Sequence, residues 1–232
     1  MRTFNLVLLF ILLNFITLNA KESYLKKADR YFSEGKFSLA EIFYKKVLQE
    51  TPDSFVANYN LGKIYYNNDK YKNAIKHLKT AYDIKPDKEV LFLMASCYIL
   101  DNQIKKGMSI YTNLLKKYPD YADVHLNAGL VYLKYLYDKE GTIYHWENFL
   151  KLRPDDPQAP AIRKALQYLK DPNFVLKPPS TEKETPTGTG TETVTVTETG
   201  ATALPVIIKG KDLKTKSEEK YKLKEKKTIT TE

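Results

Sequence analysis

Apolar and polar residues alternate along the middle of the chain with the spacing of amphipathic helices, and short polar breaks separate the apolar stretches. The stretches come in pairs. The first helix of each pair is predicted over Glu22–Glu34, Phe55–Asn67, Glu89–Leu100 and Ala122–Tyr135. The second is predicted over Phe37–Glu50, Tyr71–Ile84, Ile104–Lys117 and Lys139–Leu152. Breaks such as Gly35-Lys36 and Asp101-Asn102 are short enough to make the two helices of a pair antiparallel.

Each pair ends on a proline, and these prolines define the repeat. They lie 34, 33 and 35 residues apart, at Pro52, Pro86, Pro119 and Pro154. Proline lacks an N–H and has a fixed φ, so it ends the second helix and turns the chain. This period is typical of stacked helical hairpins, none of which buries its apolar face alone. We predict repeats at about 21–54, 55–87, 88–121 and 122–156, and a half-polar capping helix at about 159–170.

The residues within the repeats resemble the tetratricopeptide repeat (TPR) over about 21–154. The second unit carries the clearest copy, with Leu61-Gly62, Tyr65, Tyr71, Ala74, Leu78, Ala81 and Pro86. The third is more degenerate, and the fourth, with Gly129 and Trp146, has one extra residue between its helices. The resemblance implies an all-α, right-handed superhelical solenoid of about four helix-turn-helix units. A capping helix and then a disordered tail are expected to follow.

The resemblance also implies that side chains of each first helix line a concave groove. The candidate partner-binding residues are Tyr59, Asn60, Lys63, Tyr66, Phe92, Leu126, Asn127 and Leu130. Further implied groove positions are Leu25, Asp29, Phe32, Val56, Ser96, Ile99 and Leu133. Asn60 offers both a donor and an acceptor to a peptide backbone, and tyrosine is enriched at binding hot spots. The alternative for Tyr59 and Tyr66 is that they pack on neighbouring helices.

One specificity of the family is not expected. Family members that grip the C-terminal carboxylate of chaperone tails use basic residues at places that Leu25, Glu89 and Leu93 hold here. Only the central Asn60 matches that pattern. An apolar, tyrosine-lined groove instead favours a helical or extended segment with hydrophobic anchors.

The first twenty residues have the pattern of a secretory signal peptide. Arg2 precedes the apolar run Leu6–Leu18, and Leu18-Asn19-Ala20 offers a cleavage site. The run is shorter than the ~20 residues that a spanning helix needs. Position 21 is Lys rather than Cys, which excludes a bacterial lipid anchor there. We expect an exported, periplasmic bacterial protein; the alternative is an inner-membrane anchor through an uncleaved signal, and the sequence leaves cleavage after Ala20 open.

The segment 172–232 is predicted to be a disordered tail, rich in Thr and then in Lys, because it has almost nothing to bury. Its Lys-rich end, 209–232, has the composition for weak contact with an anionic membrane or cell wall. The alternative is a solubilising end. The net charge of +9 is spread over the helices as well, so nucleic acid is not expected as a partner.

No catalytic, metal or cofactor motif is present. His77, His125 and His145 lie on three different predicted helices, and His145 is expected to be partly exposed. Cys97 is the only cysteine and is expected to be buried. We therefore predict a non-enzymatic adaptor or scaffold of the cell envelope that binds a segment of another protein in its groove. The alternative is a structural or surface-tethering protein that acts through its tail; the partner and the oligomeric state stay open.

Overall fold

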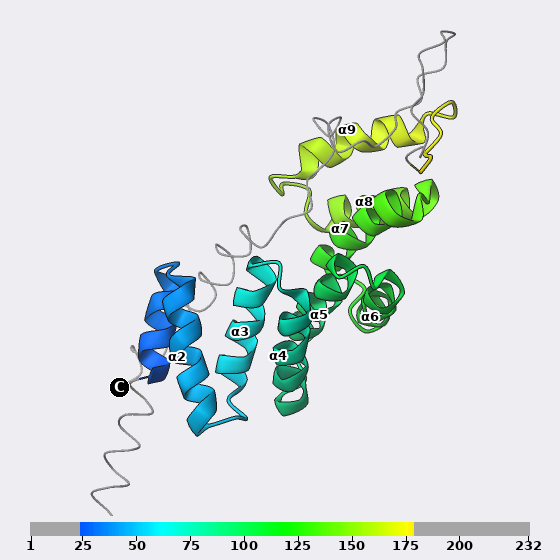
Figure 1. The fold of residues 1–232 in the computed structure, drawn as a ribbon. Coiled ribbons are helices and arrows are strands. Elements are labelled where there is room, and N and C mark those ends of the chain that lie inside the picture. Colours follow the sequence, from blue (N-terminus) through cyan, green and yellow to red (C-terminus); the bar gives the residue numbers. More distant parts are fainter. Residues whose placement is uncertain (1–23, 179–232) are drawn as a thin grey trace, which may run out of the picture. The chain divides into compact units, whose positions relative to one another are not determined.

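The computed structural model describes residues 24–178, and the regular elements within that range are helices (Figure 1). Residues 24–33 are helical. There follow α2 (Phe37–Glu50), α3 (Phe55–Asn67), α4 (Tyr71–Ile84), α5 (Lys88–Leu100), α6 (Ile104–Lys117), α7 (Ala122–Val131), the π-helical turn η1 (Tyr132–Leu136), α8 (Lys139–Leu152) and α9 (Ala159–Lys170). The predicted signal peptide and the tail from residue 179 onward lie outside the described residues.

The predicted helical hairpins are confirmed, and most helices begin and end where the pattern places them. The one clear difference is the first helix of the fourth unit, which was expected to run to Tyr135. Instead α7 ends at Val131 and continues as η1. Within the described residues the chain divides into two compact units, 24–97 and 98–178, with the boundary inside α5.

The turns inside the hairpins share one backbone conformation. A left-handed residue follows the first helix each time, at Gly35 (φ 72°), Asp69 (φ 58°), Asn102 (φ 60°) and Tyr137 (φ 51°). Gly, Asp and Asn tolerate this region, whereas a bulky residue such as Tyr is unusual there. The next N–H then bonds back to a tyrosine carbonyl, as when Lys70 N donates to Tyr65 O at 2.9 Å. This closes the helix as in a Schellman motif.

The fourth turn shows where its extra residue goes. In the first three turns the carbonyl acceptor lies five residues before the donor, but Asp138 N donates to Tyr132 O, six residues back, at 3.0 Å. The widened turn is η1, a single π-helical turn of the kind that accommodates an inserted residue. The insertion therefore leaves the start of α8 in its expected place at Lys139.

Glycines allow close helix crossings in the second and fourth hairpins. Gly62 of α3 faces Leu78 of α4 so closely that a Cβ on the glycine would lie 2.6 Å from Leu78 Cδ2. Gly129 of α7 makes the same approach to Trp146 of α8, where a Cβ would lie 2.4 Å from Cδ1. Both partner side chains are fully buried. The repeat's small residue thus makes room for a large one across each crossing.

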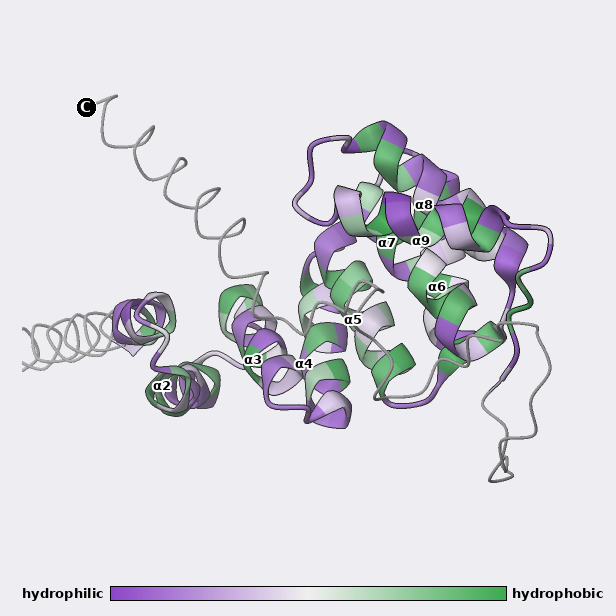
Figure 2. Ribbon diagram, turned by 90° about the horizontal axis from the view of Figure 1, so that it is seen from above, coloured by the Kyte–Doolittle hydropathy of each residue, from purple (hydrophilic) through white to green (hydrophobic). Residues whose placement is uncertain are grey.

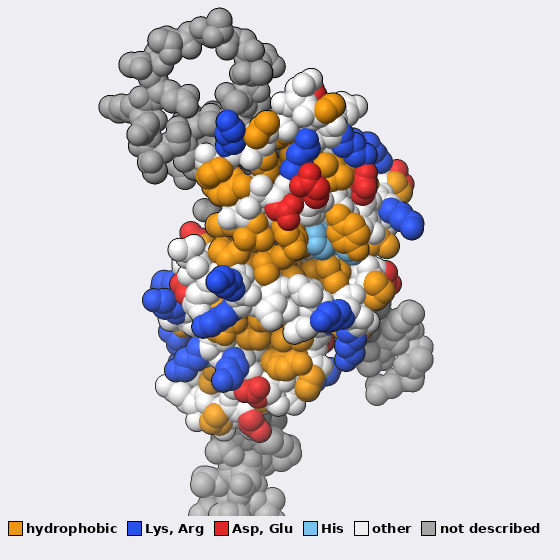
Figure 3. Space-filling view, turned by 90° about the vertical axis from the view of Figure 1, so that its right-hand side faces the viewer, with side chains coloured by type: hydrophobic (Ala, Val, Ile, Leu, Met, Phe, Trp, Pro, Cys, Tyr) orange, Lys and Arg blue, Asp and Glu red, His pale blue; other side chains and the backbone are white. Residues whose placement is uncertain are grey.

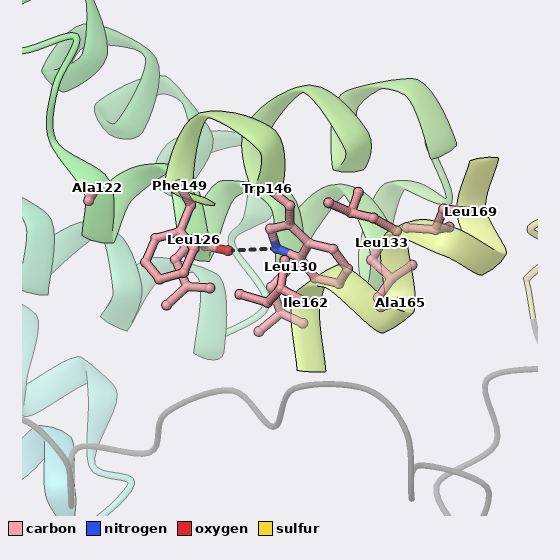
Figure 4. Close-up of a cluster of buried hydrophobic side chains, with 10 residues drawn as sticks. Ala122, Leu126, Leu130, Leu133, Trp146, Phe149, Ile162, Ala165 and Leu169 are labelled. Carbon is pink, nitrogen blue, oxygen red and sulfur yellow. Dashed lines mark hydrogen bonds between the residues drawn. The ribbon is translucent and has the colours of Figure 1, made fainter. Parts of the chain in front are cut away.

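The core of the second unit lies between α7, α8 and α9 (Figure 4). It contains Ala122, Leu126, Leu130, Leu133, Trp146, Phe149, Ile162, Ala165, Leu166 and Leu169. The indole Nε1 of Trp146 donates to Leu126 O at 3.2 Å, which satisfies the polar atom of the largest buried side chain. Hydrophilic and hydrophobic residues alternate along α9 (Figure 2), and its apolar face closes this core. The predicted capping helix is therefore present.

The packed region continues past residue 171, where the tail was expected to begin. Phe174 and Leu176 pack against the same core. Lys139 fastens this strap, residues 171–176, by donating from Nζ to Asp171 O at 3.0 Å and to Phe174 O at 3.2 Å. The apolar side chains of the strap thus extend the packed region to residue 176.

Candidate functional site

A stripe of side chains on α3 forms the candidate site in the first unit. Val56, Tyr59, Asn60 and Lys63 follow the i, i+3, i+4, i+7 spacing that puts residues on one face of a helix. Val56 is 40% exposed, and the other three are half-buried. The helix begins at Ser54, whose Oγ accepts from Ala57 N at 3.4 Å. A fixed helix therefore presents the whole stripe.

Asn60 takes part in a hydrogen-bond chain that orients its amide. Tyr44 Oη donates to Asp29 Oδ1 at 2.5 Å, and Asn60 Nδ2 donates to Tyr44 Oη at 2.7 Å. The one hydroxyl hydrogen of the tyrosine is donated to the carboxylate. The Asn60 amide must therefore donate from its NH2 group to the tyrosine oxygen. Oδ1 of Asn60 accepts no hydrogen bond from a described residue. The amide thus presents an acceptor in a defined direction.

Aromatic rings and lysines alternate along the same surface. Lys63 Nζ lies 4.7 Å from the centroid of Phe32 and 5.7 Å from that of Tyr59. Tyr59 stacks on Phe55 with centroids 5.8 Å apart, and Lys85 Nζ lies 5.6 Å from the Phe55 ring. Exposed cation–π contacts are worth about 0.5–1 kcal/mol each. They hold the ring of Tyr59 and the neighbouring rings of Phe32 and Phe55 in place.

The other candidate residues lie elsewhere. Tyr66 is 6% exposed and packs edge-on against Tyr71, as the alternative for this tyrosine expected. Phe92 is buried at 7% exposure. Leu126 and Leu130 are core residues under α9, so that helix covers the face that the family's register assigns to a groove. Of the eight candidates, Tyr59, Asn60 and Lys63 share one partly exposed surface in the first unit.

Asn127 repeats the interaction of Asn60 in the second unit. Its Nδ2 donates to Tyr111 Oη at 3.3 Å. The pair Asn127–Tyr111 lies 67 residues after the pair Asn60–Tyr44, with the same spacing of 16 between the partners. Each asparagine therefore links the first helix of its hairpin to the second helix of the hairpin before it. If it also binds a partner in the groove, it must do so while keeping that bond.

A second repeated pair was missed by sequence reasoning because the histidines were considered separately. Asn58 Nδ2 donates to Pro52 O, and Asn58 Oδ1 accepts from His77 Nδ1 at 3.0 Å. Sixty-seven residues after Asn58, His125 bonds through Nε2 to Pro119 O and through Nδ1 to His145 Nδ1, both at 3.0 Å. Asn58 and His125 lie 67 residues apart, at the same position of their repeats. A comparison of these two positions in the sequence would have identified the second pair.

His145 is buried rather than partly exposed as expected. It is 8% exposed, stacks on Tyr132 and meets Tyr144 edge-on. Burial, followed by the neighbouring His125, lowers the pKa of His145 to about 4, and Asp138 opposes this weakly. Burial also lowers the pKa of His77. Both histidines are therefore held in the neutral form at neutral pH.

The described residues offer little that would hold a metal. Within residues 24–178, no group of three or more His, Cys, Asp or Glu side chains is placed to bind an ion. Cys97 is buried, as expected. No helix in this same range is long and apolar enough to cross a membrane. On the face seen in Figure 3, lysines and arginines are spread between apolar and neutral side chains.

Comparisons with known proteins agree with the helical-repeat fold. The family model of the tetratricopeptide repeat protein 21 C-terminal ARM domain matches residues 18–127. Human tetratricopeptide repeat protein 21A is 26% identical over 106 residues, which are 45% of this chain but 8% of that protein. A tetratricopeptide repeat protein from Parabacteroides merdae superposes with a TM-score of 0.58 at 19% identity, over 67% of this chain and 62% of that one. The chain therefore has a TPR-like helical repeat fold.

Other solved structures share the fold. MamA from Desulfovibrio magneticus superposes with a TM-score of 0.55 at 21% identity, over 59% of this chain and 77% of that one. An O-GlcNAc transferase from Thermobaculum terrenum matches with a TM-score of 0.51 at 20% identity, over 58% of this chain and 26% of that one. These likenesses show the fold alone. A TPR-like fold is consistent with a protein–protein interaction scaffold, because stacked repeats present extended binding surfaces.

Proposed function

We propose that this protein is a non-enzymatic adaptor that binds a segment of another protein along the α3 stripe of Val56, Tyr59, Asn60 and Lys63. The observation that supports this proposal is the fixed orientation of the Asn60 amide, whose Nδ2 donates to Tyr44 Oη at 2.7 Å. Its Oδ1 then accepts a backbone N–H from the bound segment without reorganisation. Val56, exposed at 40%, and the ring of Tyr59 bury an apolar anchor beside that bond.

The charges along the stripe indicate which segments bind. Lys63 and Lys85 place cations at two points beside the rings of Phe32, Tyr59 and Phe55. The carboxylate of Asp29 is engaged by Tyr44 Oη. A segment with an apolar anchor and a neutral or acidic neighbour suits this surface, whereas a basic segment is repelled.

We place this adaptor in the bacterial cell envelope, with the partner among the envelope proteins. The signal-like pattern of residues 1–20 supports the export of the chain. A second candidate function is tethering to an anionic surface through residues 209–232, which carry nine lysines against five acidic residues. The two functions reside in different parts of the chain and can be separated.

The test is capture of envelope proteins by the immobilised full chain, compared with three variants. The stripe variant is Tyr59→Ala with Asn60→Ala. The matched control is Asn127→Ala, which removes the equivalent bond to a tyrosine but leaves the stripe intact. The third chain ends at residue 208. Circular dichroism and thermal melting establish that each variant is folded.

A partner lost by the stripe variant and kept by the other two supports the adaptor, and titration of that purified partner gives the affinities. From the loss of two central contacts we expect about a tenfold to hundredfold weaker Kd. A partner that the stripe variant retains with wild-type affinity refutes the site. Loss on removing residues 209–232 alone transfers the function to the tail.

A further inference from the structure

The two units use the same place in the repeat for two different hydrogen-bond pairs. In the first unit, Asn58 connects the carbonyl of the closing Pro52 to His77 on α4. In the second unit, His125 connects the carbonyl of the closing Pro119 to His145 on α8. Asn58 and His125 are both buried, and each joins the turn before its helix to the second helix of the hairpin. The difference between amide and imidazole is therefore a difference in chemistry at one position.

The hydrogen bonds of the first pair determine which of its atoms carry hydrogens. Asn58 Nδ2 donates to Pro52 O at 3.0 Å and to Ser54 O at 3.1 Å, so its Oδ1 is the acceptor that faces His77. His77 must then carry a hydrogen on Nδ1 to make the 3.0 Å bond. Protonating the other ring nitrogen of His77 leaves this bond in place. The pair in the first unit therefore survives the gain of a proton.

The second pair behaves differently because both partners are imidazoles. His125 Nε2 faces a carbonyl and so carries a hydrogen, which leaves its Nδ1 as the acceptor for His145 Nδ1–H in the neutral pair. One added proton goes to His145 Nε2 and leaves this bond in place. It puts a positive charge on a buried ring whose Nδ1 lies 3.0 Å from the second imidazole, with no counter-charge between the rings.

The surroundings do not compensate for a positive charge on His145. Tyr132 of η1 stacks on His145, and Tyr144 of α8 lies against both histidines. The preceding turn offers the backbone carbonyl of Pro119 to His125. Asp138 is the carboxylate that acts on His145, and it is weaker than burial and the neighbouring His125. Asp138 also caps α8 by accepting from Gly141 N at 2.9 Å, so its charge is shared with the helix end.

We propose that the His125–His145 pair is an acid-sensitive tie in the second unit: a proton gained by buried His145 places a charge beside a second imidazole and favours opening of the junction of the Pro119 turn, α7 and α8. In the first unit the corresponding His77 faces the neutral amide of Asn58, so that unit responds less to acid. Because the tie lies in the second unit and the α3 stripe in the first, this inference does not rest on the proposed function.

The sign of the pH dependence follows from the buried pair. The pKa of His145 falls from its ordinary value of 6.5 to about 4, so the closed state binds protons less readily than the open state. The closed junction is therefore fully favoured above about pH 6.5 and is progressively lost as the pH falls toward 4. For His145 alone, the opening equilibrium rises about 30-fold between pH 7.5 and pH 5.0.

The test is amide hydrogen exchange of the full chain at pH 7.5 and 5.0, expressed as protection factors so that the intrinsic pH dependence is removed. We expect protection in 121–129 and 142–149 to fall about 30-fold, the effect of the His145 shift, and protection in 54–67 and 71–84 to fall several times less. His125→Asn installs the chemistry of the first unit in the second, and we expect it to reduce the fall without abolishing it, because His145 stays buried. Asn58→His is the converse variant and should introduce the acid sensitivity into α3 and α4.

The outcomes are separable. A fall that is largest in 121–149 and is reduced by His125→Asn supports the tie. Equal falls in both units, or a fall that persists unchanged in His125→Asn, overturn the proposal. If His125→Asn does not fold, His145→Gln serves in its place, since glutamine does not titrate and the amide can still accept from or donate to His125.

Discussion

The crossing of Gly129 and Trp146 gives the sharpest prediction about stability. In Gly129→Ala the new Cβ would lie 2.4 Å from Trp146 Cδ1 and 2.6 Å from Nε1, whereas carbon atoms in contact prefer about 3.5–4.0 Å. The indole is fully buried and cannot turn into solvent. If it moves away, its 3.2 Å bond to Leu126 O lengthens. The substitution therefore overpacks a crossing that has no flexible partner.

Three contributions determine how far Gly129→Ala changes the free energy of unfolding. Overpacking a core typically costs about 1–3 kcal/mol. Loss of the indole hydrogen bond costs about 1 kcal/mol more. Alanine is the better helix former by about 1 kcal/mol, which offsets part of this. We expect Gly129→Ala to lower the free energy of unfolding by about 2 kcal/mol, despite a change that would stabilise an exposed helix.

The assay is urea unfolding followed by circular dichroism and by tryptophan fluorescence. Trp146 is the only tryptophan of the chain, so its emission reports on the second unit alone. The control is the same substitution in a Trp146→Ala background. There the steric conflict is absent, and Gly129→Ala should stabilise by about 1 kcal/mol through helix propensity. A Gly129→Ala protein as stable as the wild type would refute the steric argument.

Two further predictions concern the turn inside the last hairpin and the strap that follows α9. Tyr137→Asn should raise the free energy of unfolding by about 1 kcal/mol, because Asn suits the left-handed conformation (φ 51°) better than Tyr; a lower urea midpoint would contradict the assigned strain. A chain that ends at residue 171 should be less stable by about 2 kcal/mol than one that ends at 178, because it lacks the partly buried Phe174 and Leu176. Equal thermal midpoints for these two chains would show that the strap contributes nothing.

The helices and their repeat could be predicted from the sequence because each rests on local chemistry. The prolines act within a turn of themselves, and the glycines at the crossings meet partners only 16 or 17 residues later, in the same hairpin. The end of α7 could not be predicted in the same way. The sequence shows one extra residue between Gly129 and Trp146, but whether a loop or a π-helical turn absorbs it depends on packing on both sides.

The candidate site was predicted only in part, again for physical reasons. The family's register identifies which face of a first helix a residue occupies, and it placed Tyr59, Asn60 and Lys63 on one surface. It does not say what covers that face. In the second unit α9 covers it, so Leu126 and Leu130 became core residues. The bond between Asn60 and Tyr44 depends on side-chain rotamers in two different helices, which no local pattern encodes.

The strap at residues 171–176 and α9 together cover the face of the last described hairpin on which a further repeat would stack. A longer array would stack its next hairpin on the outer face of α8, where α9 now lies with Lys170 Nζ 2.6 Å from Glu147 Oε1. Behind α9 the chain is fastened a second time, through Lys139. A protein engineer who wished to lengthen the array would therefore have to insert new hairpins before residue 159 and move the whole terminating segment outward.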